Sequence, residues 1–382
     1  MFAVAVAPML IGAGACTGAT PTELEEPWRG TQVSATEPAG EVGSEVGDGE
    51  GTPAESGDGA GVGQGSGDKG KGGKNCQADA TKFDAPGNGA DDDCNGKIDD
   101  VVACDASLAL DSTDPIDAAK ALGLCAKATG SAWGVVAARW VKPDGTKLPT
   151  SGNVSHGILT GFGSNSPREA KSMLALSSGA ARAPGQNGYG SPSGVSKNYA
   201  SGAPSGYPRT SDACYDAPGT PMDGVALELD IRVPSNATSM SFAYQLFSYD
   251  FPYEICTAYA DQFVVTMTPP PPGAISANIA LDPDGKVLDS SSVSGMRACK
   301  SGWYAGLDYE CPLGISGLAG TGYENHAASG WLRSTVPVQP GSSITLRFAI
   351  WDSEDGQSDS LVLLDGLSFG TSKLASVQVT TP

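Results

Sequence analysis

The sequence predicts a mainly β protein, an antiparallel β-sandwich or jelly-roll-like domain with long Gly/Ser/Pro-rich loops. Apolar and polar residues alternate over several runs between residues 225 and 350, and turn residues separate these runs. Convincing helical patterns are few. Alternation with a period of two places one face of each strand in a core, and turns at regular spacing are typical of sandwiches.

Composition divides the 382 residues into five predicted segments. Only the part after the tether, about 300 residues, can bury a sizeable core. The segments are a lipoprotein-like signal segment (1–16), a disordered acidic tether (17–75), a small cysteine-containing calcium-loop segment with one short helix (76–128), the β-sandwich domain (129–372) and a C-terminal tail (373–382).

The first segment is an apolar run that ends in small residues before Cys16. Ala13-Gly14-Ala15-Cys16 resembles the lipobox of bacterial lipoproteins, which implies cleavage, lipidation of Cys16 and a place on the cell surface or outer membrane of a Gram-negative bacterium. The run is too short to span a bilayer as a helix. An ordinary secretory signal cleaved near Ala15 is the alternative. Because no Lys or Arg precedes the run, Met1 need not be the true start.

The tether is dominated by Gly, Ser, Glu and Asp, and it has little to bury. We expect a flexible coil that reaches about 40 Å and holds the folded part away from a membrane. The whole chain has a net charge of -20. Such a surface repels nucleic acid and anionic lipid, so membrane contact is expected through a lipid anchor only.

Eight of the nine cysteines follow the tether, and an even set in an exported chain predicts four disulfides. Four of them precede residue 130 and four follow residue 210, so we expect pairing within each half. The eight are Cys76, Cys94, Cys104, Cys125, Cys214, Cys256, Cys299 and Cys311.

Residues 91–99, D-D-D-C-N-G-K-I-D, have the spacing of the front of an EF-hand-type calcium loop. Oxygens at alternate positions can converge on one cation, and the glycine permits the sharp turn. Val102 stands where the bidentate Glu belongs, so Asp100 could substitute. A disulfide-bound acidic turn without metal is the alternative. The expected ligands are Asp91, Asp93, Asn95, the Lys97 carbonyl and Asp99.

The same stretch resembles a metal-binding motif of the D-x-D-C-x-G type that occurs in exported myxobacterial and related proteins. A short helix is expected after it, capped by Asp114, with Pro115 in its first turn and Gly123 at its end. Cys125 would then hold the end of this helix.

Strands are expected at the alternating runs 225–233, 240–246 and 344–350, and at 263–265. A continuous apolar run at 361–364 is typical of a strand buried on both faces, and 173–176 also fits a strand. Residues 180–222 are rich in Gly, Ser and Pro, so a long surface loop is expected there.

Three blocks of the body, GILTGFGSNSPREAKSMLALSSG (157–179), SMSFAYQLFSYDFPYEICTAYADQFVV (239–265) and GWLRSTVPVQPGSSITLRFAIWDSEDGQSDSLVLLDGLSF (330–369), resemble the choice-of-anchor L domain of bacterial surface proteins, including deltaproteobacterial ones. The resemblance covers most of residues 130–370. It implies a β-rich extracellular module, attached to the cell by varied means, with no established reaction.

Two acidic sets in these blocks suggest a second calcium site at one end of the sandwich, and a solvated acidic hairpin is the alternative. The candidate ligands are Asp352, Asp355, Asp359 and Asp365 in one block, and Glu254 and Asp261, together with Asp250, in the other.

Aromatic residues between 300 and 331 offer a surface for a glycan or a surface-protein ligand. Plugging the ends of the sandwich is the alternative. The candidates are Trp303, Tyr304, Tyr323 and Trp331.

Nothing in the sequence assigns a catalytic residue. His156 and His326 are the only histidines, and neither lies in a nucleophile or zinc motif. We therefore expect a surface-anchored, calcium-stabilised β module for adhesion, ligand binding or envelope structure. An extracellular hydrolase that acts on polysaccharide through a carboxylate pair is the alternative.

Overall fold

The computed structural model describes residues 76–101, 103–215 and 218–381. The signal segment, Cys16 and the tether lie outside these residues. The described chain is mainly β, with a single α-helix among the elements found there, as the sequence predicts. Among the same residues, no helix has the length and apolar character needed to cross a bilayer.

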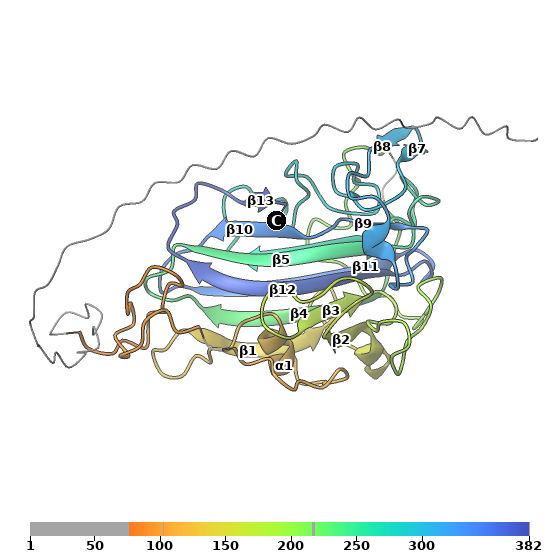
Figure 1. The fold of residues 1–382 in the computed structure, drawn as a ribbon. Helices are drawn as coiled ribbons and strands as arrows, with labels where there is room; N and C mark the ends of the chain where they lie inside the picture. Colours follow the sequence, from red (N-terminus) through yellow and green to blue (C-terminus); the bar gives the residue numbers. More distant parts are fainter. Residues whose placement is uncertain (1–75, 102, 216–217, 382) are drawn as a thin grey trace, which may run out of the picture. The chain divides into compact units, whose positions relative to one another are not determined.

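Two antiparallel sheets form the body of the fold (Figure 1). The four-stranded sheet has the order β1-β4-β11-β6, and long strands form its centre. Its strands are β1 (Gly134–Val141), β4 (Pro221–Arg232), β6 (Gln262–Thr268) and β11 (Ser343–Ser353).

The second sheet has the order β13-β10-β5-β12-β3-β2, and β9 also pairs with β5. Its two central strands come from the second and third blocks of the body. Its strands are β2 (His156–Leu159), β3 (Met173–Ser177), β5 (Ser239–Ser248), β9 (Ala327–Ala328), β10 (Leu332–Pro337), β12 (Ser360–Gly370) and β13 (Gln378–Thr380). β13 pairs with β10 and lies within the predicted C-terminal tail.

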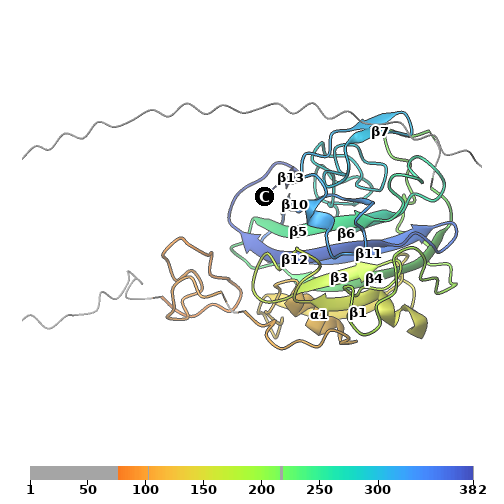
Figure 2. The ribbon, with the colours of Figure 1, turned by 45° about the vertical axis from the view of Figure 1, so that its right-hand side comes forward.

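The two sheets pack face to face as a sandwich (Figure 2). The Phe242 ring on β5 lies 5.6 Å from the Phe348 ring on β11, edge to face. The Tyr244 ring lies 5.9 Å from the Phe263 ring on β6. All four side chains are fully buried, so the apolar positions of the alternating runs face one shared core.

Part of the outer face of each sheet is covered as well. Leu361 and Leu363 of β12 pack in a second apolar cluster, whereas Val362 and Leu364 face the main core. Ala349 and Trp351 of β11 belong to a third cluster on the other sheet. The continuous apolar run at 361–364 is therefore a strand buried on both faces, as predicted.

Residues 76–128 share the main core with the sandwich. Helix α1 (Pro115–Ala121) buries its apolar side there, and the Asp114 carboxylate accepts a hydrogen bond from Ile116 N at its start. Gly123 follows with φ +102, and a Cβ there would lie 3.3 Å from the Leu367 carbonyl oxygen. The predicted cap and stop of this helix are confirmed.

The eight described cysteines form four disulfides, each within one half of the chain. Cys104–Cys125 holds the end of helix α1, as expected. The other pairs are Cys76–Cys94, Cys214–Cys256 and Cys299–Cys311, the last of which closes the hairpin of β7 (Gly302–Tyr304) and β8 (Leu307–Tyr309).

The prediction of a surface loop over residues 180–222 is partly wrong. Ala181 is fully buried in the second cluster, and Tyr207 packs at 6.2 Å from the Trp351 ring. Small residues and prolines suggested exposure, but they allow this segment to lie close against both sheets. The last two residues of the range already belong to β4.

The cross-sheet contact of Phe348 yields a stability prediction. We expect Phe348→Ala to lower the free energy of unfolding by about 3–5 kcal/mol, because truncation leaves a cavity between the sheets. Val136→Ala is the control, since Val136 is 52% exposed, and a surface change costs within about 0.5 kcal/mol. Urea denaturation measures both, and equal costs would contradict the assigned core.

Candidate functional site

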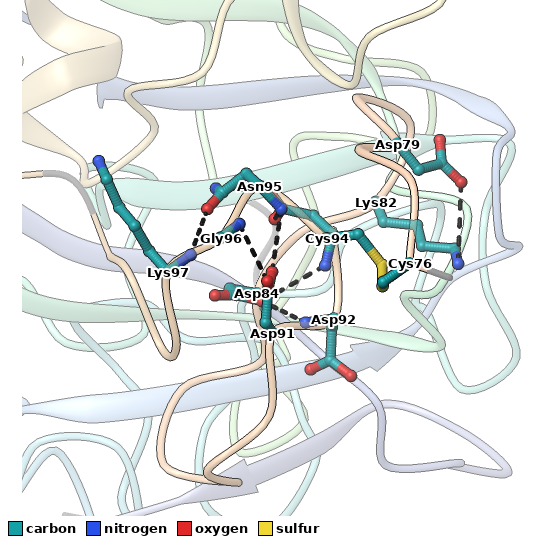
Figure 3. The surroundings of a disulfide bond; sticks show 11 residues. Cys76, Asp79, Lys82, Asp84, Asp91, Asp92, Cys94, Asn95, Gly96 and Lys97 are labelled. Atoms are coloured by element: carbon teal, nitrogen blue, oxygen red, sulfur yellow. Dashed lines mark hydrogen bonds and ion pairs between the residues drawn. A yellow bond between two sulfur atoms is a disulfide. The ribbon is translucent and has the colours of Figure 1, made fainter. Parts of the chain in front are cut away.

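The acidic loop is organised around one buried carboxylate, that of Asp84 (Figure 3). Its Oδ1 accepts hydrogen bonds from the backbone N–H of Asp92 at 2.6 Å and of Asp93 at 3.4 Å. Its Oδ2 accepts one from Asp100 N at 3.2 Å. Because Asp84 is only 7% exposed, these bonds fix the loop backbone around a carboxylate that solvent scarcely reaches.

Three carboxylates meet at this point. One oxygen each of Asp84, Asp93 and Asp100 lie within 4.8 Å of one another. The Asn95 side-chain amide also points there, since its Nδ2 donates to Asp93 Oδ2 at 3.0 Å and to Asp100 Oδ1 at 3.2 Å. A half-turn of that amide would give up the hydrogen bond that its Oδ1 accepts from Lys97 N and would present Oδ1 to the cluster instead, so these four side chains can offer an all-oxygen cation site.

Electrostatics within this cluster favour a cation. Burial raises the pKa of the Asp93 carboxyl, and the nearby charges of Asp84 and Asp100 raise it further, although hydrogen bonds from Asn95 lower it. Like charges brought this close repel one another unless a proton or a metal ion neutralises them. A divalent cation would relieve this repulsion without protonating the loop.

The structure gathers only part of the ligand set predicted from sequence. Asp93 and Asn95 belong to the cluster, whereas Asp91 accepts hydrogen bonds from Asn95 N and Gly96 N, which closes the turn. Asp99 accepts from the backbone N–H of Asn88 and Gly89. The Lys97 backbone N–H donates to Asn95 Oδ1, and its ammonium lies 3.7 Å from the Asp100 carboxylate.

Asp84 was missed from sequence because it lies seven positions before the motif. Nothing in the spacing marks it as a ligand. The only signal in the sequence was indirect. Cys94 lies within the motif, and a disulfide from it to an upstream cysteine brings the residues before the motif close to the loop. The Cys76–Cys94 disulfide and the hydrogen bond from Asp79 N to the Asp93 carbonyl (2.8 Å) do this.

The second acidic set forms a buried cluster at one end of the sandwich. Asp261 Oδ1 accepts from Ser353 N at 2.9 Å, and Asp352 Oδ1 accepts from Gly356 N at 2.8 Å. Asp250 and Asp359 are each 1% exposed and influence these groups electrostatically. The structure thus brings Asp250, Asp261, Asp352 and Asp359 of the predicted set together.

Burial raises the pKa of these carboxyls. It raises the pKa of Asp352 to about 9 and that of Asp359 to about 7, and neighbouring carboxylates add to the effect. The pKa values of Asp250 and Asp261 are raised well above the usual range, chiefly by burial. Among the described residues, Asp352 Oδ2 and Asp359 Oδ1 are buried oxygens without a hydrogen-bond partner. The negative charge of the cluster is therefore reduced by protons or balanced by a nearby cation.

Lys197 supplies such a cation. Its ammonium donates to the carbonyl oxygens of Ser178 and Gly179, and its charge lowers the pKa of Asp359. Burial lowers the pKa of Lys197, while the carboxylates of Asp223, Asp359, Asp352 and Asp261 raise it. Sequence reasoning missed Lys197 because it lies in the Gly/Ser-rich segment far from either acidic block.

Three residues predicted as ligands of the second calcium site do not take the expected positions. Asp365 is not part of the cluster, since its Oδ2 accepts from the backbone N–H of Arg168 and Glu169. Glu254 and Asp355 act on the cluster through their charges, which raise the pKa of Asp250.

The aromatic candidates separate into core and surface residues. Tyr323 is 2% exposed and packs in the second apolar cluster. Trp331 lies beside Arg168, whose guanidinium is 6.0 Å from the ring centre. Trp303 and Tyr304 instead share a cleft of about 590 Å³ with Tyr253, which the sequence did not single out.

Both histidines are buried structural residues. The His156 ring stacks on Trp140 at 3.9 Å, and burial lowers its pKa to about 4. The His326 ring stacks on Tyr249, and its Nδ1 lies 2.8 Å from the Phe251 carbonyl oxygen.

Comparison with known families settles the identity of the sandwich. The model of the choice-of-anchor L domain matches residues 145–370, which is more than half of the chain. The chain belongs to the choice-of-anchor L domain family. This choice-of-anchor L domain includes every strand from β2 to β12, and the family association makes the chain a surface-associated module. No curated protein matches it significantly.

Lys197 yields a prediction about the buried carboxylates. We expect Lys197→Met to lower the free energy of unfolding at pH 7 by about 3 kcal/mol. The substitution removes the ammonium charge that faces the buried carboxylates in the folded state and leaves those carboxylates without their cationic partner. Lys147→Met is the control because Lys147 is exposed. Chemical denaturation compares them. A Lys197→Met protein as stable as wild type would show that protons alone neutralise the cluster.

Proposed function

We propose that this choice-of-anchor L protein is a calcium-stabilised module, displayed on the cell surface, for adhesion, ligand binding or envelope structure. The observation that carries the calcium part is the convergence of Asp84, Asp93 and Asp100, with oxygens within 4.8 Å. The fold supports a binding role through its loops, because apolar clusters already cover part of the outer face of each sheet.

The donor set favours calcium over other metals. Carboxylate and amide oxygens suit hard cations, and the nearby sulfur of Cys94 is taken up in a disulfide. Mg²⁺ demands a compact octahedron, whereas Ca²⁺ accepts six to eight ligands in flexible geometry. Three carboxylates on a partly exposed loop support an affinity on the order of 0.1–1 mM, as in other extracellular calcium modules.

Anchoring belongs to the same proposal. The lipobox-like sequence before Cys16 and the acidic tether support a lipoprotein held on the outer membrane of a Gram-negative, deltaproteobacterial-type cell. The family itself supports surface association without specifying the anchor. The tether would then give the sandwich its distance from the membrane.

The second calcium site stays a prediction with weaker support. Its cluster already contains the Lys197 ammonium, which competes with a metal ion for the same carboxylates. The polysaccharide-hydrolase alternative also has weaker support. Asp250, Asp261, Asp352 and Asp359 are each at most 2% exposed, so a polysaccharide chain has no route to these carboxylates.

Calorimetric titration with CaCl2 tests the loop. We expect wild type to bind calcium with millimolar-range affinity and Asp100→Asn to lose most of the binding heat, because one of three carboxylates is removed. Asp99→Asn is the matched control: its amide oxygen can still accept the hydrogen bonds that Asp99 Oδ1 accepts from Asn88 N and Gly89 N, and only the bond from Gly89 N to Oδ2 is lost. That variant should keep the wild-type affinity.

Thermal melts provide a second readout. Calcium at about ten times its dissociation constant should stabilise wild type by about 1.4 kcal/mol, a rise in Tm of about 2–4 °C. Absence of binding heat and of a Tm shift in wild type would refute calcium stabilisation. Loss of binding in Asp99→Asn but not in Asp100→Asn would refute the ligand set.

A further inference from the structure

We propose that the cleft formed by Tyr253, Trp303 and Tyr304, with Lys300 and Asn325 at its edge, binds the pyranose ring of an oligosaccharide. This inference deepens the ligand-binding role proposed above by naming the ligand class. It depends on surface display but not on calcium, because none of these residues belongs to the acidic loop.

The first observation is the exposure of two large aromatic side chains in one concavity. Tyr253 is 80% exposed and Trp303 is 71% exposed, although both line the same cleft. Leaving an indole in water forgoes roughly 2 kcal/mol or more of burial energy. Exposed aromatic surface on an ordered element therefore points to a binding role.

The second observation is the rigid support beneath these rings. Trp303 and Tyr304 lie on β7, and Cys299–Cys311 closes the β7–β8 hairpin. The buried Phe251 ring packs edge to face on Tyr304 at 5.1 Å and on Tyr309 at 5.0 Å.

Hydrogen bonds tie the same rings to the backbone. The Tyr304 hydroxyl donates to the Lys300 carbonyl at 2.9 Å, and the Tyr309 hydroxyl donates to the Ser291 carbonyl at 3.1 Å. Tyr304 and Tyr309 are thus held in place before a ligand arrives, so the hairpin that carries Trp303 is a fixed support, which reduces the entropy cost of binding.

The shape and chemistry of the cleft favour a sugar over a protein. A volume of about 590 Å³ suits a small ligand, whereas a stable protein interface needs about 800 Å² on each partner. A pyranose ring presents an apolar C–H face that stacks on an indole and hydroxyls around its rim. The Lys300 ammonium can donate to those hydroxyls, and the exposed Asn325 amide can donate and accept.

The net charge of -20 also disfavours a nucleobase as the stacked ring, because a nucleic acid would bring its phosphates to an acidic surface. The cleft and the acidic loop share no residue. The two sites can therefore be tested separately.

The test is binding of defined oligosaccharides to the purified full chain. Cellohexaose, chitohexaose, xylohexaose, mannohexaose and oligogalacturonate serve as probes, followed by a glycan array, with tryptophan fluorescence and calorimetry as readouts. We expect saturable binding of at least one glycan. Trp303→Ala and Tyr253→Ala should each weaken it at least about tenfold, as loss of a central aromatic contact does.

Tyr215→Ala is the matched control, because Tyr215 is fully exposed but outside the cleft. It should bind as wild type does, and so should Asp100→Asn, which separates this site from the calcium loop. Circular dichroism checks that each variant is folded. The proposal is overturned if no glycan binds saturably, if Trp303→Ala binds like wild type, or if the cleft instead captures peptides from a peptide library in a Trp303-dependent way.

Discussion

The apolar layer between the two sheets is the interaction on which the other features depend. β4 and β11 pack against β5 and β12 through fully buried aromatic and aliphatic side chains, of which the Phe242–Phe348 contact is the clearest. Helix α1 and Phe83 join the same layer from the N-terminal side. If this layer did not form, the acidic loop would have no support, because the loop adjoins Phe83 directly.

Because apolar clusters cover part of the outer face of each sheet, the exposed loops are the better candidates for function. The outer clusters are built from segments such as 180–183 and 203–207, which lie over the strands and also bring Lys197 near the buried carboxylates. Disulfides then fix the loops that remain exposed. Cys76–Cys94 holds the acidic loop, and Cys299–Cys311 holds the hairpin that carries Trp303.

The strands and helix α1 were predictable because their signals are local. A period of two, a capping Asp114 and Gly123 describe one segment each, without reference to distant residues. The site residues were only partly predictable because sites form between segments. Asp84 and Lys197 come from outside the motifs, and no spacing rule joins them to Asp93 or to Asp359.

The prediction that Asp365 joins Asp359 in one metal site was wrong. Asp359 and Asp365 are close in sequence, but six residues along an extended strand cover about 20 Å, so the two carboxylates belong to different places. Tyr323 was likewise grouped with Trp303 because the two residues are near each other in the sequence. It is buried under the outer face of the second sheet, whereas Trp303 lies on the exposed hairpin.

The most direct test of calcium binding in the acidic loop is a crystal structure from crystals grown with millimolar calcium, with anomalous scattering used to locate the ion. We expect one anomalous peak between the carboxylates of Asp84, Asp93 and Asp100, with the Asn95 amide turned to present its oxygen. A peak coordinated by Asp91 and Asp99 instead, or none in the acidic loop, would contradict this expectation.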